Sequence, residues 1–578
     1  MRDGRRTGAG SATTYGELLE WWATASPEAA ALVDERGAQS HAELAGRVAS
    51  LTSGLAGLGV GRGDVVAVWL PNMREWVETA FAAAALGAIA LGVNTKLRGY
   101  DVEGLLREAA AKVLVTRPGF RGIDFFGMLG EIDPKVMAGL SAVLCVGEPG
   151  QSEGATEAPP PGGVLGGNVR QLDYEEVVSG SGTSGAAAAA VSRTGSSEPA
   201  WPAQAFTSSG STGRPKLILH SQEGLLFHAH ACAKAFGFDA PDAVVLGALP
   251  LCGVFGYNTM LAGLAAGRPV ILQPVFTARD ALELVASEGV THMTVSDTML
   301  RMLLDAIPPG EEGRYATWRE AAFGIFTAGN PQDIIDAGTR LGKKFFQTYG
   351  SSEILALMTY PAAGSGPARW VLGGGQPVAE DIQVRIRTAD GRAAAVGEQG
   401  EIHVKGRNVT VGLLRAGTVE PVKTDADGFF ATGDLGFLTT PRDVVYQSRL
   451  GDALRIAGFL VSPREVEAFL ETLPQVDQAQ YVAVDSERGL VPVAFVTAAP
   501  GAKADEAAVR QACGKQLAAF KAPKRVVFVE AFPVLSGANG DKVDKKALRA
   551  LATDVLAAEP AASQTSGARL QRSASGQG

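Results

Sequence analysis

The chain has 578 residues, of which 52 are Lys or Arg and 61 are Asp or Glu, so its net charge is −9 at pH 7. This balance lacks the basic surface that neutralises phosphates, which argues against nonspecific nucleic-acid binding. Hydrophobic residues make up 46% of the chain and charged residues 20%, as in globular proteins, and the length predicts more than one domain. Four scattered cysteines are too few for a disulfide framework and lack zinc-site spacing, so we expect reduced thiols and a cytoplasmic location.

Two segments could be mistaken for targeting or membrane signals. The N-terminus is rich in Arg, Gly, Thr and Ser rather than apolar residues, so no signal peptide is predicted. Residues 243–267 are uncharged and long enough to cross a bilayer, but Pro250, Gly253, Gly256 and Asn258 interrupt them. We therefore expect a short strand, a turn and a helix there, and no membrane span.

Short apolar runs alternate with amphipathic helical patterns along much of the chain. In chain order, this alternation predicts right-handed β-α-β units and an α/β domain whose sheet is covered by helices. After about residue 382 strands and turns dominate, and after residue 453 strands combine with two helices. The predicted strands are 65–70, 89–93, 112–116, 269–273, 292–295, 383–387, 401–405, 433–438 and 444–448, and the predicted helices are 76–86, 100–110, 278–288, 298–306, 463–473 and 506–518.

These changes of rhythm predict two domains. A large N-terminal α/β domain with a small β-rich subdomain is expected over 15–447, and a small α+β domain over 448–555. Residues 1–14 and 556–578 are rich in small and polar residues and are interpreted as disordered tails. Residues 146–201 contain a Pro-Pro-Pro-Gly-Gly run and five consecutive alanines, which indicates a low-complexity insertion, interrupted by one apolar, acidic piece.

The segment Thr-Ser-Ser-Gly-Ser-Thr-Gly-Arg-Pro-Lys at 207–216 combines five hydroxyls, two glycines and a lysine. Glycines let backbone N–H groups converge on an anion, hydroxyls add donors and the lysine adds charge, so the segment predicts a loop that binds nucleotide phosphates. It is not the P-loop of NTPases, because Arg214 and Pro215 separate Gly213 from Lys216 and no Ser or Thr follows the lysine. The alternative is a Ser/Gly linker that continues the preceding insertion.

Residues 208–216 resemble the phosphate-binding signature of the adenylate-forming superfamily, which includes acyl-CoA synthetases, nonribosomal peptide adenylation domains and beetle luciferases. Six further motifs of that family follow in order. Residues 347–353 (Gln-Thr-Tyr-Gly-Ser-Ser-Glu) resemble the adenine and magnesium motif. The others lie at 400–412, 428–434, 449–467, 517–524 and 539–544 and resemble the strand–turn, ribose, hinge and two last motifs. The resemblance covers about residues 15–551 and implies a small mobile C-terminal domain, with the active site between the domains.

The resemblance implies a reaction in two steps: a carboxylate attacks the α-phosphorus of ATP to give acyl-adenylate and pyrophosphate, and a thiol then displaces AMP. It implies that Ser352 contacts the α-phosphate, Glu353 lies near Mg²⁺, Tyr349 stacks on adenine, and Asp434 and Arg449 hold the ribose. The other nucleotide-binding residues implied are Thr207, Ser208, Ser211, Thr212, Gly213, Lys216, Gly329, Asn330 and Gly350. On local sequence alone, the two acids could equally be a helix N-terminal acid and a turn aspartate.

Lys542 is implied to be the catalytic lysine of the first step, because an ammonium that reaches the carboxylate and the α-phosphate favours the transition state. The alternative is a solvated lysine in a lysine-rich turn. The chain departs from the family here, since Asp541 stands between Gly540 and the lysine. It departs again at the hinge, where family members place Asp or Lys and this chain has Gly451, which permits rotation without a charged contact.

The acyl pocket is implied by residues 250–256, where the family has an aromatic residue and a histidine at the positions of Cys252 and Gly253. No aspartate lies between Asp242 and Asp280 to pair with an amino-acid ammonium, which predicts an uncharged fatty, other acyl or aryl acid. We interpret Asp297 as the N-cap of helix 298–306, with a substrate-amine role as the alternative. The other pocket residues implied are Val254, Gly256, Asn258, Gly329 and Gly350.

The acceptor thiol is inferred from residues 458–467, which resemble the acyl-CoA synthetase form of the hinge motif, with Gly458 and Phe459 at the acceptor tunnel. No carrier domain with a phosphopantetheine serine follows, so CoA is predicted as acceptor, with ATP and Mg²⁺ as the other requirements. One alternative is a stand-alone enzyme that loads an acyl or amino acid onto a separate carrier protein. A second is an inactive nucleotide-binding or scaffold homologue.

Overall fold

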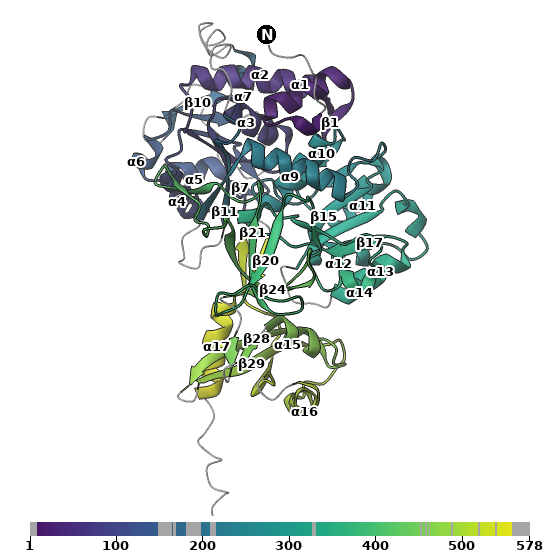
Figure 1. Ribbon diagram of the computed structural model, residues 1–578. Coiled ribbons are helices and arrows are strands. Elements are labelled where there is room, and N and C mark those ends of the chain that lie inside the picture. Colours follow the sequence, from purple (N-terminus) through teal and green to yellow (C-terminus); the bar gives the residue numbers. More distant parts are fainter. Residues whose placement is uncertain are drawn as a thin grey trace, which may run out of the picture. The chain divides into compact units, whose positions relative to one another are not determined.

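The computed structural model describes residues 9–147, 164–165, 169–180, 198–208, 216–325, 331–450, 454–456, 459–461, 463–486, 489–517, 521–537 and 540–557 (Figure 1). They fall into two compact units. The larger holds the described residues up to Leu450, and the smaller holds those from 454 onward apart from a short stretch at 536–541. The expected low-complexity stretch 146–201 and the two expected tails lie largely outside the described residues.

A ten-stranded sheet forms one half of the larger unit. β4, β3, β5, β8 and β10 pair in parallel, β11 joins β4 in parallel, and the remaining neighbours are antiparallel. The strand order is β23-β22-β12-β11-β4-β3-β5-β8-β10-β9. The strands are β3 Val65–Trp69, β4 Ile89–Gly92, β5 Val113–Thr116, β8 Ala142–Cys145, β9 Val164–Leu165, β10 Val169–Asp173, β11 Pro202–Ser208, β12 Lys216–Ser221, β22 Gly412–Arg415 and β23 Thr418–Pro421.

A seven-stranded sheet forms the other half, in the order β17-β16-β15-β13-β14-β1-β2. All its neighbours are parallel except the β1–β2 hairpin. Parallel sheets are covered on both faces, which explains why β13, β14 and β15 are buried at every residue. The strands are β1 Ala30–Asp34, β2 Gly37–Ser40, β13 Val245–Gly247, β14 Val270–Leu272, β15 His292–Ser296, β16 Glu320–Gly324 and β17 Lys344–Gln347.

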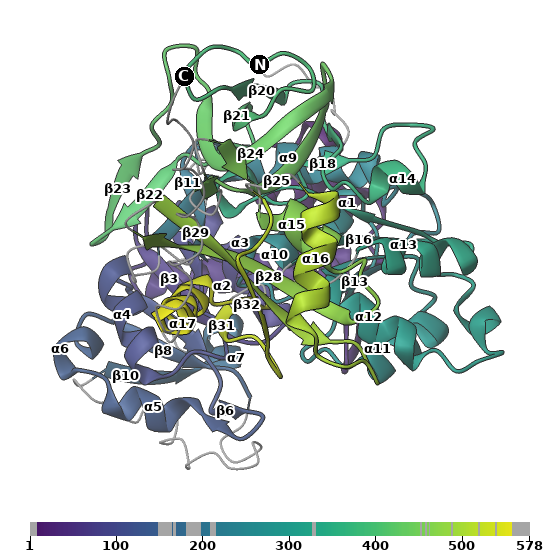
Figure 2. The same cartoon turned by 90° about the horizontal axis from the view of Figure 1, so that it is seen from below.

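Helices cover both sheets in layers. One apolar core lies between the two sheets and includes side chains of α1 Tyr15–Ala25, α2 His41–Gly57, α3 Arg74–Ala85, α9 Gln222–Ala235 and α10 Val254–Ala265. A second core lies under α4 Gly99–Ala109, α5 Phe125–Glu131 and α6 Pro134–Met137, on the other face of the ten-stranded sheet. A third lies under α11 Ala278–Glu288, α12 Asp297–Ala306 and α13 Pro331–Arg340. Figure 2 shows these two outer groups of helices on opposite sides of the larger unit.

The apolar segment 243–267 folds as predicted, with a strand, a turn and a helix. Every residue of α10 is buried. The helix packs between the two sheets, which explains why it carries no charged side chain. Among the described residues, no helix is both long and apolar enough to cross a membrane.

The strands and helices predicted before residue 307 are all present, with ends within two residues of the prediction. The N-cap prediction for Asp297 is wrong. Ser296 is the N-cap of α12, because its short hydroxyl accepts the backbone N–H of Met299 at 3.1 Å, and Asp297 is the first helical residue. The acidic piece inside the predicted insertion is built into the fold as β10 and α7 Tyr174–Ser179: the Tyr174 hydroxyl donates to Glu78 Oε2 at 3.0 Å.

The predicted β-rich part of the larger unit is a four-stranded antiparallel sheet of order β20-β21-β24-β25. Its strands are β20 Gln383–Arg387, β21 Gly400–Lys405, β24 Phe430–Thr440 and β25 Asp443–Arg449. The short strands β18 Thr359–Tyr360 and β19 Gln376–Pro377 and helix α14 Pro367–Trp370 connect it to β17.

The smaller unit has its own sheet of order β28-β29-β30. α15 and α16 pack in the core on one face of this sheet, and α17 packs in the core on the other. Its elements are β26 Leu454–Ile456, β27 Phe459–Val461, α15 Pro463–Leu470, β28 Val476–Ser486, β29 Gly489–Ala498, α16 Glu506–Gln516, β30 Arg525–Phe528 and α17 Lys545–Ala557. The strands β31 Val534–Gly537 and β32 Gly540–Val543 are divided between the two units.

Candidate nucleotide site

The predicted phosphate loop connects the ends of two paired strands. Thr207 and Ser208 end β11, Lys216 begins β12, and Ser208 lies opposite Lys216 in the antiparallel ladder. Thr207 and Ser208 are half-buried and Lys216 is exposed. The hydroxyl and ammonium groups at the mouth of the hairpin are thus available to an anion, while Ser211, Thr212 and Gly213 lie outside the described residues.

Tyr349 of the predicted adenine motif leaves the end of β17 and is buried. Its backbone N–H donates to Thr359 Oγ1 at 2.9 Å, and its hydroxyl donates to Asp434 Oδ2 at 2.7 Å. Its ring stacks on Tyr446, with 5.3 Å between ring centroids and 16° between planes. The motif brings Tyr349 to Asp434 across 85 positions of sequence, as the resemblance implies for two groups that hold one nucleoside.

Asp434 is the most perturbed acid among these residues. It is 2% exposed in β24, and burial raises its pKa to about 6, although Arg449 and the Tyr349 hydroxyl oppose the rise. Arg449 Nη1 lies 3.0 Å from Asp434 Oδ1, but it donates its hydrogen bond to the Thr432 carbonyl. Within the described part of the chain no donor hydrogen-bonds to Asp434 Oδ1. The nearby Arg449 guanidinium offsets part of the cost of burying this oxygen, and a ribose hydroxyl would supply the hydrogen bond that it lacks.

Ser352 and Glu353 lie in a single 3-10 turn, η4 Ser352–Ile354, and both are half-buried. The charge of Glu353 is close enough to Asp434 to contribute to the raised pKa of that acid, after burial. Among the described residues no three His, Cys, Asp or Glu side chains form a metal cluster. Mg²⁺ commonly binds one or two carboxylates and completes its shell with phosphates and water, so a lone Glu353 fits a magnesium ion that arrives with a nucleotide.

The backbone after Glu353 adopts an unusual conformation. Leu355, Ala356 and Leu357 have φ values of 64°, 42° and 23°, a left-handed run of three non-glycine residues. Each such residue costs about 1–2 kcal/mol relative to the right-handed form. Gly350 makes this path possible: a Cβ atom there would lie 2.5 Å from the Cα of Ala356. Gly350 is therefore required for close packing of the loop, in addition to the nucleotide role that the resemblance implies.

The predicted acyl-pocket residues Cys252, Gly253, Val254 and Gly256 lie buried at the start of α10. A Cβ atom at Gly256 would lie 2.4 Å from the Pro250 carbonyl oxygen, so this glycine lets the helix pack against the preceding turn. Burial raises the pKa of the Cys252 thiol to about 12, which disfavours the thiolate that a nucleophilic cysteine requires.

The remaining predicted residues belong to the hinge, the nucleotide loop and the smaller unit. Lys542 is exposed in β32, and the neighbouring Lys545 donates to Glu467 Oε1 at 2.6 Å, which marks Lys545 as structural. Phe459 begins β27. Gly329, Asn330, Gly451 and Gly458 lie outside the described residues.

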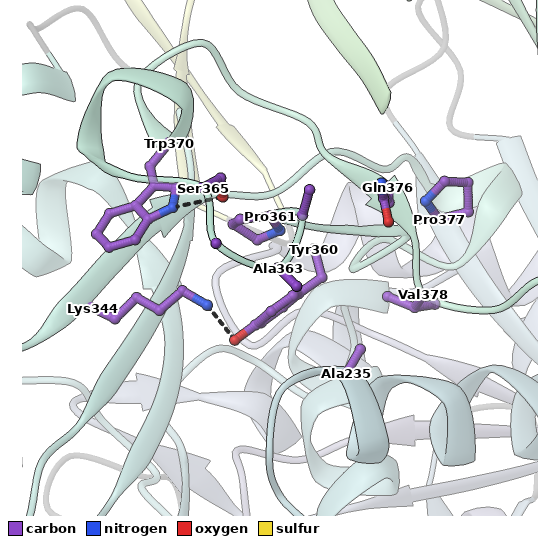
Figure 3. Close-up of a pocket in the computed structure, with 12 residues that line it drawn as sticks. Ala235, Lys344, Tyr360, Pro361, Ala363, Ser365, Trp370, Gln376, Pro377 and Val378 are labelled. Atoms are coloured by element: carbon purple, nitrogen blue, oxygen red, sulfur yellow. Dashed lines mark hydrogen bonds between the residues drawn. The ribbon is translucent and has the colours of Figure 1, made fainter. Parts of the chain in front are cut away.

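A cavity of about 570 Å³ lies apart from these residues and is lined by Lys344, Tyr360, Ser365, Trp370 and Gln376, among others (Figure 3). Four of its polar side chains, those of Lys344, Tyr360, Ser365 and Trp370, already have partners. Lys344 donates to the Tyr360 hydroxyl and lies 3.5 Å from the buried Glu320, and Trp370 Nε1 donates to Ser365 Oγ at 3.2 Å. No residue of the sequence motifs lines it, so we do not place the chemistry there.

The sequence motifs did not point to several residues that support the site. His220 of β12 and Tyr446 of β25 lie outside the motifs and contact Ser352 and Tyr349. Asn408 lies within the motif at 400–412 but was given no role, and it donates to the Ile354 carbonyl just after the adenine motif. The one signal in the sequence is a histidine in the otherwise apolar run Leu-Ile-Leu-His at 217–220.

Comparison with known proteins identifies the family of the chain. The family model described as AMP-binding enzyme matches residues 19–414, and the model of the AMP-binding enzyme C-terminal domain matches residues 465–536. The chain is 30% identical to the 2-succinylbenzoate–CoA ligase of Geobacillus kaustophilus, over 90% of this chain and 95% of the relative. It is also 30% identical to the indoleacetate–CoA ligase of Aromatoleum aromaticum, over 86% of this chain and 90% of the relative. The crystal structure of ATP-bound MatB from Rhodopseudomonas palustris has the same fold, with a TM-score of 0.73 at 24% identity over 93% of this chain and 99% of that chain. The chain therefore belongs to the family of AMP-binding enzymes, with the family's large N-terminal domain and smaller C-terminal domain.

Proposed function

We propose that this AMP-binding enzyme is an AMP-forming acid–CoA ligase that acts on an uncharged, aromatic carboxylic acid. The observation that carries the proposal is the group of Tyr349, Asp434 and Arg449, in which one oxygen of the buried carboxylate has an ion pair with Arg449 but receives no hydrogen bond from any described residue. This group lies in the same unit as Ser352, Glu353 and the phosphate hairpin, which are the parts that nucleotide activation requires.

The proposed reaction balances in two steps. In the first, a carboxylate oxygen of the acid forms a bond to the α-phosphorus of ATP, and the bond to the β-phosphate breaks to release pyrophosphate. In the second, the sulfur of CoA attacks the acyl carbon, AMP leaves with the bonding electrons, and the thiol proton passes to solvent. Both steps place negative charge on oxygens, so donors fixed in advance supply most of the rate.

Each residue has a separate proposed role in the first step. Thr207, Ser208 and Lys216 would bind the β- and γ-phosphates, and Ser352 would donate to the α-phosphate. Bound Mg²⁺ would neutralise charge on the phosphates, with Glu353 as its protein ligand. Lys542 would bind the transferring oxygen and the α-phosphate together. The roles proposed for Ser211, Thr212, Gly213, Gly329 and Asn330 remain as the resemblance implies, and so do those of Gly451, Gly458 and Phe459.

One feature supports an aromatic acid, and another argues against an α-amino acid. The relatives cited above are named as ligases of 2-succinylbenzoate and indoleacetate. In addition, no Asp or Glu occurs between Asp242 and Asp280, a stretch that contains the buried helix α10, so nothing there would pair with an α-ammonium group. The four cysteines are buried and unpaired, which is compatible with the proposed cytoplasmic location.

The test is acid-dependent release of pyrophosphate from ATP and Mg²⁺ across a panel of aryl, arylalkyl, fatty and amino acids, each with and without CoA. We expect turnover with aromatic acids and, when CoA is present, an acyl-CoA and AMP. Pyrophosphate release that CoA leaves unchanged would favour loading of a separate carrier protein. No release with any acid would favour the inactive homologue.

The lysine assignment has its own test, because the two steps can be measured separately. Lys542→Ala should lower acyl-adenylate formation by about two orders of magnitude or more while thioester formation from supplied acyl-adenylate survives. Lys546→Ala is the matched control, since Lys546 is also exposed and lies four residues further along, in the first turn of α17. An equal loss in both steps would remove the assignment.

A further inference from the structure

The strained turn after Glu353 is held from outside by hydrogen bonds to its carbonyl groups. His220 Nε2 lies 2.7 Å from the Ser352 carbonyl oxygen, and the backbone N–H of Thr410 donates to the Glu353 carbonyl at 2.7 Å. Asn408 Nδ2 donates to the Ile354 carbonyl at 3.1 Å. Asn258 Nδ2 donates to the Leu355 carbonyl, and Cys232 Sγ donates to the Leu357 carbonyl at 3.5 Å. Five consecutive or nearly consecutive carbonyls thus depend on groups from β12, α9, α10 and the loop after β21.

Three of these donors are deeply buried polar side chains. His220, Asn258 and Asn408 are each at most 1% exposed. A carbonyl oxygen can only accept, so the His220 tautomer must carry its proton on Nε2. Burial lowers the pKa of His220 to about 4, so the ring stays neutral at physiological pH. The interaction is therefore a fixed neutral hydrogen bond, insensitive to pH near 7.

The apolar side chains of the turn cannot hold this backbone by themselves. Ile354, Leu355 and Leu357 are buried and supply packing, but packing alone does not select a left-handed φ, which leucine and alanine disfavour. A strained conformation persists only where the surroundings over-determine it. The groups that donate hydrogen bonds to these carbonyls supply that constraint. The first two of the carbonyls belong to Ser352 and Glu353.

We infer that His220, Asn258 and Asn408 are positioning residues for nucleotide activation, which hold the turn so that the Ser352 hydroxyl and the Glu353 carboxylate point at the α-phosphate and its magnesium ion. This inference rests on the proposed function. It also explains the position of each residue: His220 lies four residues after Lys216 on β12, and Asn258 lies on α10, the helix that begins with the predicted acyl-pocket residues. The turn therefore connects the phosphate hairpin and the acyl helix to the acid that would bind magnesium.

The decisive variants change His220, because its bond is made to Ser352 itself. His220→Leu removes the donor and keeps the volume apolar, whereas His220→Gln keeps an N–H donor close to the position of Nε2. The matched control is His41→Leu in α2, which removes another buried imidazole, 2% exposed, that stacks on Trp22. Two quantities are measured for each protein: the magnesium concentration that gives half-maximal ATP binding by calorimetry, and kcat for acid-dependent pyrophosphate release.

Loss of a group that orients a metal ligand commonly costs 10–100-fold in metal affinity or activity. We therefore expect His220→Leu to raise the half-saturating magnesium concentration about tenfold and to lower kcat about 30-fold, and His220→Gln to recover both to within about threefold. His41→Leu should leave both unchanged. The same pattern, smaller in size, is expected for Asn408→Leu.

Two results would overturn this inference, and a third would overturn the proposed function alone. If His220→Leu lowers the melting temperature but leaves the magnesium requirement as in the wild type, the residue is structural and the inference is overturned. Wild-type ATP binding that does not depend on magnesium would also overturn it. If the wild type binds ATP with magnesium but activates no acid, the proposed function fails, and the magnesium requirement of the variants still tests the positioning role by itself.

Discussion

Two buried aspartates of the larger unit, each beside arginine, differ in how completely they are satisfied. The side chain of Asp34, at the end of β1, is 3% exposed although the residue as a whole is half-buried, and Asp434 in β24 is buried as a whole, at 2% exposed. Arg74 and Arg36 both hydrogen-bond to the Asp34 carboxylate, and the backbone N–H of Arg36 donates to it as well. Asp434 has the Tyr349 hydroxyl on one oxygen and no hydrogen-bond donor, among the described residues, on the other.

The pKa values differ because Asp34 receives more hydrogen bonds and because Asp434 is the more deeply buried residue. Burial acts to raise the pKa of Asp34, but the hydrogen bonds from Arg74 and Arg36 together have the larger effect and lower it to about 2. For Asp434 burial wins, and the pKa rises to about 6. A fully paired buried acid is a structural element, whereas an under-satisfied one retains capacity for a ligand. The comparison therefore separates acids that hold the fold from acids that hold a substrate.

The largest expected effect follows from removing the charge of the under-satisfied acid. Asp434→Asn should lower kcat/KM for ATP about 100-fold, because hydrogen bonds to a charged acceptor are worth roughly 1.5–3 kcal/mol. The free energy of unfolding at pH 7 should not fall, since the folded wild type must ionise a carboxyl that burial disfavours. Steady-state kinetics and urea denaturation of the same preparation measure both quantities. A variant with wild-type kcat/KM would show that Asp434 is structural.

The same substitution at Asp34 should lower stability and leave kcat/KM for ATP nearly unchanged. Asp34→Asn should lower the free energy of unfolding by about 2 kcal/mol, because a pKa held about two units low corresponds to roughly that energy. Its pKa is depressed on folding, so this contribution is present above about pH 4 and is lost as the pH falls towards 2. Urea denaturation at pH 3 and pH 7 checks the sign. A loss of kcat/KM equal to that of Asp434→Asn would remove the distinction between the two acids.

Much of the fold was predictable because its signals are local. Apolar runs such as 65–70 and 292–295 alternate with helical patterns, and parallel strands buried on both faces require that alternation. The error at Asp297 is also local: serine and aspartate are both good N-caps, and their adjacency leaves the choice to the backbone path. The ordering of strands into two sheets depends on long-range pairing, for which the sequence holds no direct signal.

The residues of the candidate site also fall into those that local motifs predict and those that depend on long-range contacts. Tyr349 and Asp434 could be named because their motifs are short and recur in order, and the structure brings them together. His220, Asn258 and Asn408 could not be assigned to the turn, since they bind backbone carbonyls whose positions depend on the three-dimensional path. The left-handed run from Leu355 to Leu357 was likewise beyond prediction, because these residue types disfavour that conformation.

A smaller effect is expected when the pH is changed, because the raised pKa of Asp434 should appear both in stability and in the affinity for ATP. Because the pKa of Asp434 is raised on folding, its stabilising contribution is complete below about pH 4 and is lost as the pH rises through about 6. ATP affinity should run the other way, since the ionised acid accepts ribose hydroxyls, and should fall up to about tenfold per pH unit below 6. Calorimetric titrations of the wild type and Asp434→Asn from pH 5 to 8 test this. The ionisation of ATP itself affects both proteins equally, so the difference between the two curves reports Asp434. Parallel curves for the two proteins would contradict the assignment.

The smallest effect expected comes from the one hydrogen bond that Asp434 does receive. The Tyr349 hydroxyl donates to Asp434 Oδ2 and lowers its pKa, so Tyr349→Phe should move the midpoint of the pH profile above 6 while the stack on Tyr446 remains. ATP affinity at pH 7 should fall about threefold to tenfold, the usual net value of one hydrogen bond. Tyr360→Phe is the matched control, because that hydroxyl also donates to a buried carboxylate, Glu320, at 2.9 Å but lies away from the motif residues. A midpoint that stays at 6 in Tyr349→Phe, or moves equally in Tyr360→Phe, would mean that the titration seen in binding belongs to another group.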